Sequence, residues 1–279
     1  MSQSRLKTLL PDIEKRVLVM GILNVTPDSF SDGGLHDSIL AAEAHARLMI
    51  EQEVDIIDIG GESTRPGFSP ISAEEEIRRI EPIISRIAQI TDKPISIDTY
   101  KSETARTALK AGAHIINDVC GLQHDPVIAD VAAEFGAPVI IMHNRAEEDP
   151  DLDILDDMRY FFDRSLSIAY KAGIAEHNII LDPGIGFGKT DKQHFEIIQR
   201  LPELRAFGFP MLVGASRKRM IAKIVNRPPQ ERMAGTLAVH TLAAINGASI
   251  IRAHDVAEHV DAMRVTDTYK CFANESAQE

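Results

Sequence analysis

Eight short apolar runs, rich in Ile and Val, recur along the whole chain and restrict its possible folds more than any other feature. The runs read VLVMGILNV, DIIDIGG, PISID, HIINDV, PVIIMH, NIILDPG, PMLVGAS and ASIIRAH. Because they are apolar at nearly every position, they are typical of parallel strands that are covered on both faces. The segments between them, such as SAEEEIRRIEPIISRIAQI and SETARTALKAGA, carry Ser N-caps, early Glu residues and a terminal Gly. These segments are predicted to be helices.

Eight strand–helix repeats in 279 residues favour a closed (β/α)8 TIM barrel. The pattern leaves an open, doubly wound α/β sheet as the alternative. No low-complexity linker divides the chain, so we expect a single domain over residues 1–279, with its core at about residues 17 to 270. The acidic segment from Arg145 to Asp157 is predicted to be an exposed, solvated loop after the fifth strand.

The composition excludes several classes of partner and location. The formal charge is 30 − 42 = −12, which argues against nucleic acid or an anionic membrane as a partner, because neither would be attracted over long range. The two cysteines, Cys120 and Cys271, form neither a disulfide framework nor a metal-site spacing, so we expect a reduced, cytoplasmic setting. The opening MSQSRLKTLLPDIEKR lacks the apolar run of a signal peptide, and no run is long enough to span a membrane.

Polar side chains stand at the C-terminal end of each of the eight apolar runs or directly after it. They are Asn24, Glu62 with Ser63, Asp98, Asn117, His143, Asp182, Ser216, and Arg252 with His254. Any one of them can be explained by the contact of a strand end with solvent. In a TIM barrel, however, the carboxyl ends of all strands converge on one mouth, where catalytic groups gather. The joint pattern therefore favours an active site.

The stretch LDPGIGFGKT from Leu181 resembles the phosphate-binding loop of nucleotide hydrolases. That loop needs a glycine five positions before the Gly that precedes the Lys, so that backbone amides can wrap the phosphates. Gly188 precedes Lys189, but Pro183 stands at the required position and has no amide hydrogen. We therefore expect Lys189 to be a loop cation and not a nucleotide clamp.

Seven motifs, in order from the first strand to the eighth, carry a resemblance to a known family. They are GILNVTPDSFSDGG, DIGGESTRPG, SIDTYK, INDV, LDPGIGFGK, GASRKRMI and IIRAHD. The chain resembles the dihydropteroate synthases, which are pterin-binding TIM-barrel enzymes of folate biosynthesis. The resemblance implies a Mg²⁺-assisted transfer, in which p-aminobenzoate displaces pyrophosphate from a dihydropterin ester.

The resemblance implies a pterin pocket in which Asp182 accepts two N–H donors of the pterin edge in charge-assisted bonds. Asn117 and Asp98 complete that edge, because an amide both donates and accepts while a carboxylate accepts. Lys218 is expected to donate to the ring carbonyl, and Thr64 is expected to contact the pterin. Asp98, Lys218 and Arg252 are the expected catalytic residues.

The resemblance also implies an anion pocket for the leaving pyrophosphate. Arg252 and His254 are alternate residues that project to one side of the eighth strand. They are expected to hold the diphosphate, where cations stabilise the charge that develops on the leaving group. Asn24 is expected to contact the pyrophosphate and to be a ligand of Mg²⁺.

A third implied pocket holds p-aminobenzoate. Its carboxylate suits the helix N-terminus that follows Ser216, where free amides and the helix dipole favour an anion. Its ring is expected to lie near Phe30, Thr64, Arg65, Pro66 and Phe187. The loops NVTPDSFSDGG and GESTRPG are expected to close over both substrates and to exclude water.

One motif departs from the family pattern. Many members continue after the fifth strand with Met-Gln-Gly, whereas this chain has NRAEEDPDLDIL, so the path of this loop is left open. Met142 is still expected to line the pterin cavity.

Two alternative functions are a methyltransferase that passes a methyl group from methylfolate to a cobalamin protein, and a catalytically silent barrel. The SRK and TRPG segments disfavour the first, and the presence of Asp98, Lys218 and Arg252 disfavours the second. The resemblance also implies a homodimer.

Overall fold

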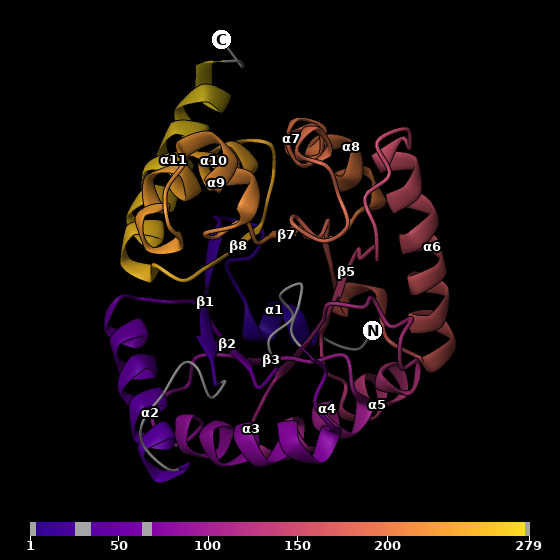
Figure 1. Ribbon diagram of the computed structural model, residues 1–279, viewed down its shortest axis with the longest axis vertical. Coiled ribbons are helices and arrows are strands. Elements are labelled where there is room, and N and C mark those ends of the chain that lie inside the picture. Colours follow the sequence, from indigo (N-terminus) through magenta and orange to yellow (C-terminus); the bar gives the residue numbers. More distant parts are fainter. Residues whose placement is uncertain (1–3, 26–34, 63–68, 277–279) are drawn as a thin grey trace.

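A closed ring of eight parallel strands, surrounded by helices, forms the centre of the computed structural model, which describes residues 4–25, 35–62 and 69–276 (Figure 1). The strands are β1 (Leu18–Asn24), β2 (Ile56–Gly60), β3 (Ile95–Asp98), β4 (Ile115–Asp118), β5 (Val139–Met142), β6 (Ile179–Asp182), β7 (Leu212–Val213) and β8 (Ile250–Ala253). Each of the eight apolar runs therefore contains one strand, as predicted.

The helices alternate with the strands. They are α1 (Arg5–Leu9), α2 (Leu35–Glu51), α3 (Ala73–Ile87), α4 (Ser102–Ala111), α5 (Val127–Phe135), α6 (Ile154–Ala172), α7 (Asp191–Gln199), α8 (Leu201–Leu204), α9 (Arg219–Val225), α10 (Met233–Ile245) and α11 (Val256–Ser276). Short 3-10 turns are η2 (Glu176–Asn178), η3 (Arg205–Phe207) and η4 (Pro229–Glu231). None of the helices in the described ranges is both long enough and apolar enough to cross a bilayer.

The strand order shows how the ring closes. Hydrogen-bonded neighbours follow the order β6-β5-β4-β3-β2-β1-β8-β7, and all the pairs are parallel. The two outer strands meet through the bridge between Leu181 and Met211. Next to it, the Leu181 amide donates to the Pro210 carbonyl at 3.0 Å. The TIM barrel is thus confirmed, and the doubly wound alternative is wrong.

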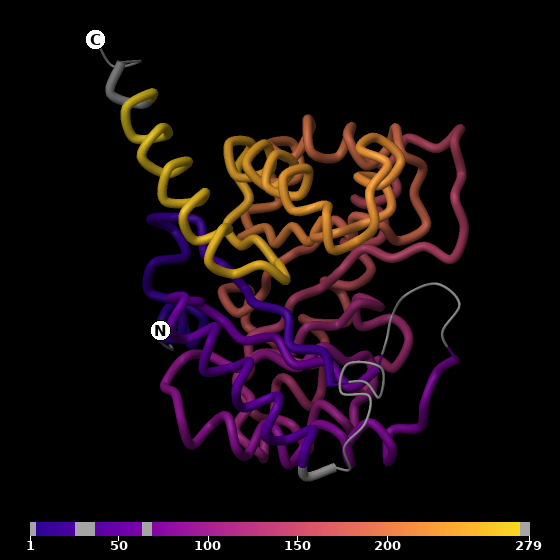
Figure 2. Tube along the Cα trace, turned by 60° about the vertical axis from the view of Figure 1, so that its left-hand side comes forward, coloured from indigo at the N-terminus to yellow at the C-terminus, as the bar shows by residue number. Residues whose placement is uncertain are grey.

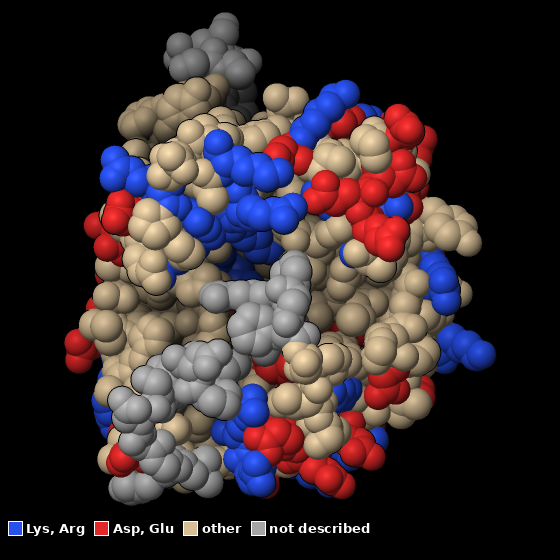
Figure 3. All heavy atoms as spheres, viewed as in Figure 1, with Lys and Arg blue, Asp and Glu red and all other residues tan. Residues whose placement is uncertain are grey.

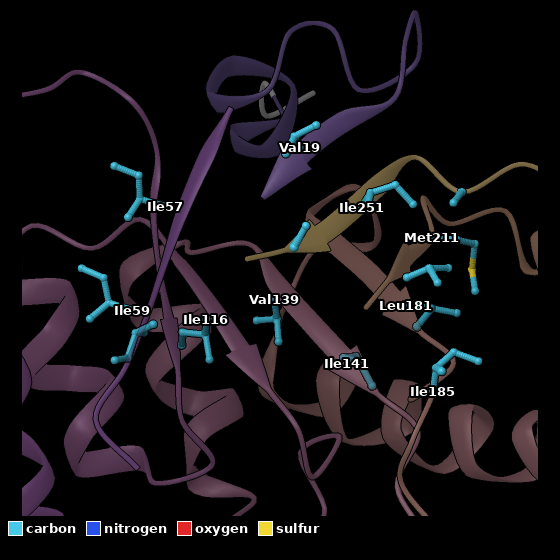
Figure 4. Packing of buried hydrophobic residues seen from close by; sticks show 14 of the residues in the cluster. Val19, Ile57, Ile59, Ile116, Val139, Ile141, Leu181, Ile185, Met211 and Ile251 are labelled. Carbon is cyan, nitrogen blue, oxygen red and sulfur yellow. The ribbon is translucent and has the colours of Figure 1, made fainter. Parts of the chain in front are cut away.

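Alternate residues of each strand face opposite sides of the sheet, and the outward set forms the larger core. These residues pack against the surrounding helices in one continuous apolar cluster. Figure 4 labels ten of its members. They are Val19, Ile57, Ile59, Ile116, Val139, Ile141, Leu181, Ile185, Met211 and Ile251. This layer fixes the positions of the strands, and with them the positions of the inward side chains.

The inward residues form a second, smaller cluster at the amino-terminal end of the strands. Its strand members are Leu18, Met20, Ile56, Ile115, Ile140, Ile180, Leu212 and Ile250. Leu6 on α1, Leu10 and Ile13 complete this cluster from below. The helix α1 is seen behind the barrel centre in Figure 1 and closes its floor. Two residues further along β2, β4, β6 and β8, the inward positions change from apolar to polar. The polar residues there are Asp58, Asn117, Asp182 and Arg252.

Two helix starts show where local sequence signals hold. Ser72 is the N-cap of α3, and its hydroxyl accepts from the Glu75 amide, as predicted. The prediction of a Ser N-cap for α4 is wrong, because Lys101 occupies that position and Ser102 lies inside the helix. The Ser102 amide is instead satisfied by the carboxylate of Asp125, at 2.8 Å. Gly112 ends α4 in the left-handed conformation, with φ +118°, as expected for a terminal glycine.

Candidate active site at the barrel mouth

A buried chain of charges crosses the floor of the mouth. Arg252 on β8 donates from Nε to Oδ2 of Asp58 on β2, at 2.6 Å. Its Nη2 donates to Oδ2 of Asp98 on β3, at 2.7 Å. The two carboxylates are 0% and 9% exposed. Two bonds use only part of the five N–H donors of a guanidinium, so Arg252 keeps donors for an anion above it.

Amide side chains extend this floor to the neighbouring strands. Asn117 on β4 donates from Nδ2 to the same Asp58 oxygen, at 3.2 Å. Asn24 ends β1 beside Gly60, which in turn pairs in register with Asp98. A Cβ placed on Gly60 would lie 3.7 Å from both Oδ1 of Asn24 and Oδ2 of Asp98. The glycine therefore leaves room between an amide oxygen and a carboxylate that face the same space.

Asp58, Asp98, Asn117 and Arg252 thus line the bottom of a cup at the barrel mouth. Several buried acceptors in this cup lack a protein donor. Oδ1 of Asp58, Oδ1 of Asp98 and Oγ of Ser96 have no hydrogen-bond partner among the described residues. Leaving such groups unpaired costs about 1 to 3 kcal/mol each. A ligand with N–H donors would satisfy them, so these atoms mark the cup as a binding site.

Asp182 and Lys218 form the opposite wall. Asp182, at the end of β6, is 5% exposed and accepts the Gly184 amide at 2.7 Å. Lys218 lies between β7 and α9, and its Nζ contacts the Ile185 carbonyl. The same Nζ lies 4.3 Å from the centroid of the Phe187 ring. Met142 pairs in register with Asp182 and is buried beside it.

Burial shifts the pKa values of these groups in the direction that favours their neutral forms. It raises the pKa of Asp98 to about 7, with Arg252 opposing the shift and Asp58 adding to it. It also raises the pKa of Asp182, against the Gly184 amide and Lys218. Burial lowers the pKa of Lys218 to about 8, although Asp182 opposes this. Shifted acids and bases gathered in one cup are typical of a catalytic site.

Arg252 behaves differently because it has two carboxylate partners. Burial alone would lower its pKa, but Asp58 and Asp98 outweigh that effect and raise it. The guanidinium therefore stays charged inside the barrel.

A second group of side chains forms the rim beside β7 and β8. The Ser216 hydroxyl and Nδ1 of His254 are 2.9 Å apart, and the His254 amide donates to the same hydroxyl at 3.2 Å. Arg217 has a positive φ of 59° and pairs with Asp255, Nη2 to Oδ1, at 2.5 Å. The turn is thereby held in a conformation that directs Ser216 and Lys218 toward the mouth.

The surface around the mouth is divided by charge. In the view of Figure 3, Lys and Arg side chains gather over α9 and α10 and continue into the central recess. Acidic side chains gather on the neighbouring part of the same face. An anionic ligand would therefore meet its cations on one side of the opening.

Comparison with known proteins decides the family. The family profile described as "Pterin binding enzyme" matches residues 20–254. The chain is 50% identical over 243 residues to the dihydropteroate synthase of Bacillus subtilis, covering 87% of this chain and 85% of that protein. The chain belongs to the dihydropteroate synthase family.

Solved dihydropteroate synthases share the fold closely. The Clostridium difficile enzyme, solved in the presence of pteroic acid, aligns with a TM-score of 0.89 and 47% identity. That alignment covers 91% of this chain and 97% of the other. The Xanthomonas albilineans enzyme with 4-aminobenzoic acid aligns with a TM-score of 0.87 and 43% identity over 92% and 94% of the two chains. The resemblance stated from the seven motifs is thus confirmed, and the chain is a transferase of folate biosynthesis.

Those of the predicted site residues that the structure describes lie around one mouth. The floor and wall contain Asn24, Asp98, Asn117, Asp182, Phe187, Lys218 and Arg252, and the rim contains Ser216 and His254. Their individual roles stay predictions. Phe30, Thr64, Arg65 and Pro66 lie outside the described residues.

Two of the polar strand ends have structural partners instead. Glu62 binds Lys101 and Tyr100 and accepts the Ile71 amide. The buried ring of His143 contacts Asp157 through Nε2 at 3.0 Å. Burial lowers the pKa of His143 to about 3, so its ring is neutral near pH 7.

The acidic segment after β5 differs from its predicted form. The expected exposed loop from Arg145 to Asp157 ends earlier, because α6 begins at Ile154 with Asp153 as its N-cap. The prediction of a solvated acidic run is wrong for Asp157, which binds Arg145 as well as His143. Early acids favour a helix N-terminus, and that signal competed here with the reading of a charged run as loop.

Sequence reasoning missed Asp58, which is the hub of the floor. It lies inside the apolar run DIIDIGG, and not at its end. An acid in the middle of a buried strand is costly unless it is paired, so its position was itself a signal of a functional partner. His240 was also missed, and its Nε2 accepts the Ala215 amide at 2.9 Å, next to Ser216.

Proposed function

We propose that the cup binds the pyrophosphate ester of 6-hydroxymethyl-7,8-dihydropterin together with p-aminobenzoate, and joins them into 7,8-dihydropteroate with release of pyrophosphate. One observation carries the proposal: buried acceptors on Asp58 and Asp98, which have no partner in the described part of the chain, share one cup with Lys218 and Arg252. The acceptors suit the donor-rich edge of a pterin, and the cations suit its carbonyl and an anionic leaving group.

The pterin edge pairs with the deep wall. Asp182 accepts two N–H groups of the pterin, while Asn117 and Asp98 complete the edge. Lys218 donates to the ring carbonyl and leaves the Ile185 carbonyl to do so. The depth of these groups supports this orientation, because Asn117 and Asp182 are 3% and 5% exposed and a planar ring would be desolvated there.

The reaction exchanges one bond at the methylene carbon of the pterin. The carbon–oxygen bond breaks, and its electron pair leaves with pyrophosphate. The amine nitrogen of p-aminobenzoate then bonds to the carbon and loses a proton. Arg252 and His254 bind the departing oxygens, so their stabilisation is greatest where negative charge develops.

Magnesium is the proposed metal, with Asn24 as its protein ligand. Within the described residues, no three His, Cys, Asp or Glu side chains are arranged to hold a metal ion. One amide oxygen fits an ion that keeps several waters and binds through few protein groups and the phosphates of the substrate. The space beside Gly60, which Oδ1 of Asn24 and Oδ2 of Asp98 border, supports this choice. When bound, the ion would neutralise charge on the leaving pyrophosphate.

The p-aminobenzoate site is proposed at the rim. Ser216 and the backbone that enters α9 bind the carboxylate, and Phe187 forms one wall for the ring. Lys218 has no side-chain cap role at the start of α9, which supports an open helix end there. Phe30, Thr64, Arg65 and Pro66 complete this site in the proposal.

The assembly and location are proposed more coarsely. We propose a cytoplasmic homodimer, from the family resemblance and the two unpaired cysteines. Exposed apolar side chains on α10 and α11 offer surface for a second copy. They are Leu242, Ile245, Val265, Tyr269 and Phe272. Sedimentation of the purified protein should give twice the chain mass of 30.7 kDa, and a monomer at all concentrations would contradict the dimer.

A coupled assay tests the reaction itself. Purified protein is mixed with the dihydropterin pyrophosphate, p-aminobenzoate and Mg²⁺, and pyrophosphate and dihydropteroate are followed together. Equal amounts of both products, without a methyl donor or cobalamin, are expected. Release of pyrophosphate without dihydropteroate would show that the protein only hydrolyses the pterin ester, and it would contradict the proposal.

A further inference from the structure

Lys189 ends the glycine-rich segment that resembles a phosphate loop, yet its ammonium is directed at the protein. The residue is 2% exposed. Its Nζ donates to the carbonyls of Gly184 at 2.9 Å, Phe187 at 3.0 Å and His143 at 3.3 Å. Three bonds use all three donors of an ammonium group. Lys189 therefore has no donor left for a substrate phosphate.

Burying the charged ammonium of Lys189 costs free energy, so we expect this charge to make interactions that offset the cost. Burial lowers the pKa of Lys189 to about 7. Asp182 and Asp157 raise it in opposition, while Lys218 and Arg145 lower it further. A methionine of similar length would avoid the desolvation penalty. What the ammonium supplies, and an apolar side chain could not, is a connection between three backbone carbonyls.

Those carbonyls belong to two segments that meet beside the cup. A Cβ on Gly184, which has φ +66°, would lie 1.9 Å from the His143 carbonyl oxygen. A Cβ on Gly188 would lie 2.3 Å from the Arg145 carbonyl oxygen. The segment 183–188 is thus packed directly against the residues that follow β5. Lys189 fastens this contact from within.

Phe187 belongs to the segment that Lys189 fastens. Its carbonyl is bound by Lys189, and its ring faces the Nζ of Lys218 at 4.3 Å from the centroid. On the same segment, the Gly186 amide donates to Nε2 of His194 at 2.8 Å. The backbone on both sides of the ring is therefore fixed by buried side chains of the following helix region.

We propose that Lys189 is a positioning residue for the second substrate. By tying the Phe187 carbonyl to the ends of β5 and β6, it holds the aromatic ring in place as a wall of the p-aminobenzoate site. Lys189 touches neither substrate. The inference rests on the proposed function, because that function assigns Phe187 to p-aminobenzoate.

Loss of the proton from Lys189 would leave two donors for three carbonyls. The KM for p-aminobenzoate is therefore expected to rise as pH increases through the neutral range. The charged and titratable groups that face Lys189 are Asp182, Asp157, Lys218, Arg145, His143 and His194. Because Lys218 and Asp98 also titrate in this range, the pH profile must be compared with that of a variant without Lys189.

The central experiment compares wild type with Lys189→Met. The KM for p-aminobenzoate should rise about tenfold, the loss expected from one or two hydrogen bonds. The Kd for dihydropterin pyrophosphate, measured by calorimetry without p-aminobenzoate, should change by less than about twofold. Lys192→Met is the matched control, because Lys192 is exposed on α7 only three residues away. It should leave both constants unchanged.

A double-mutant cycle tests the route through Phe187. If Lys189 acts by holding this ring, then Phe187→Ala and Lys189→Met should not be additive in their effects on that KM. Additive effects would overturn the proposal, and so would equal weakening of both substrates by Lys189→Met.

Two further measurements test the proposal if Lys189→Met folds poorly. The first compares the KM for p-aminobenzoate of wild type and of Lys189→Arg from about pH 6 to about pH 8. The KM should rise with pH by more in wild type, because arginine stays charged throughout, and equal profiles would overturn the proposal. The second is Lys189→Arg, which keeps the charge but replaces the three donors with a planar fork, and should give an intermediate KM. Wild-type affinity for p-aminobenzoate in that variant would also count against the proposal.

The failure of this inference differs from the failure of the proposed function. If wild type forms no dihydropteroate, the proposed function is wrong. If wild type forms it and Lys189→Met behaves like Lys192→Met, only the role of Lys189 is wrong.

Discussion

Single residues in this protein hold ionisable groups in states that water would not favour. Asp58 accepts from Arg252 and Asn117 with one oxygen, while its other oxygen has no partner among residues 4–25, 35–62 and 69–276. Asp98 shares the same guanidinium, and its pKa is raised to about 7 by burial. Without a ligand, the buried carboxylates of the cup therefore destabilise the folded state. Such a site gains affinity from each donor that a substrate brings.

Because the pKa of Asp98 is raised, we expect that replacing this carboxylate makes the folded protein more stable while activity is lost. Its folded pKa lies above the ordinary 3.8, so folding favours the protonated form. The penalty is absent below about pH 4, grows up to about pH 7 and stays constant above that. Asp98→Asn should therefore raise the Tm at about pH 8 by more than at about pH 5, while turnover is lost.

Thermal unfolding at both pH values measures this effect. Asp130→Asn, at an exposed position of α5, serves as the control. A gain in Tm that is the same at both pH values, or larger in acid, would show that folding does not raise the pKa of Asp98.

Removal of the deep carboxylate should abolish pterin binding. In Asp182→Ala the N–H donors of the pterin lose their acceptor, at a cost of about 1 to 3 kcal/mol or more for each. Calorimetric titration with the dihydropterin pyrophosphate should detect no binding. Asp156→Ala, where the side chain is 71% exposed, should bind as wild type does. Unchanged affinity in Asp182→Ala would place the pterin elsewhere.

At the scale of elements, the sequence predicted the strands better than the connections between them. The strands could be predicted because the outward face of each one, and the amino-terminal part of its inward face, pack in apolar layers, so that each strand is apolar along most of its length. The start of α6 was not legible, because acids serve equally in a loop and in a first helical turn. The site residues at strand ends were found, whereas Asp58 was missed because it is buried within a run. Partners such as Asp157 for His143 depend on tertiary packing, which the sequence does not encode locally.

The short helix α1 should contribute stability far beyond its length. Leu10, which follows it, is 3% exposed and packs into the barrel floor. Leu10→Ala should lower the free energy of unfolding by about 2 to 5 kcal/mol. Urea unfolding measures this, with Lys7→Ala at a 57% exposed side chain as the control. Because the apolar cluster that Leu10 joins lies beneath the polar layer of the site, the KM values for both substrates should stay unchanged. An altered KM would mean that this apolar cluster shapes the site.

At the scale of the whole molecule, the body is a compact ring from which the C-terminal part of α11 projects, as Figure 2 shows. The ring is uneven. β1 pairs with β2 over five residue pairs, whereas β6 and β7 meet through one bridge. The amide of Leu181, which donates across this seam, should exchange with solvent faster than that of Ile57, which donates to Pro94 at 3.0 Å. Hydrogen exchange measures both, and equal rates would indicate that the ring opens elsewhere.

The seam also separates the site by chemistry. Asp58, Asp98, Asn117 and Asp182 come before it in the chain, and Ser216, Lys218, Arg252 and His254 come after it. A break in the exposed turn at Arg205 would thus yield one fragment that holds the acceptors and another that holds the cations. Neither fragment could turn over substrate alone, so the appearance of dihydropteroate would report that the two had found each other. The site is therefore divided between two consecutive parts of the chain, and activity requires both.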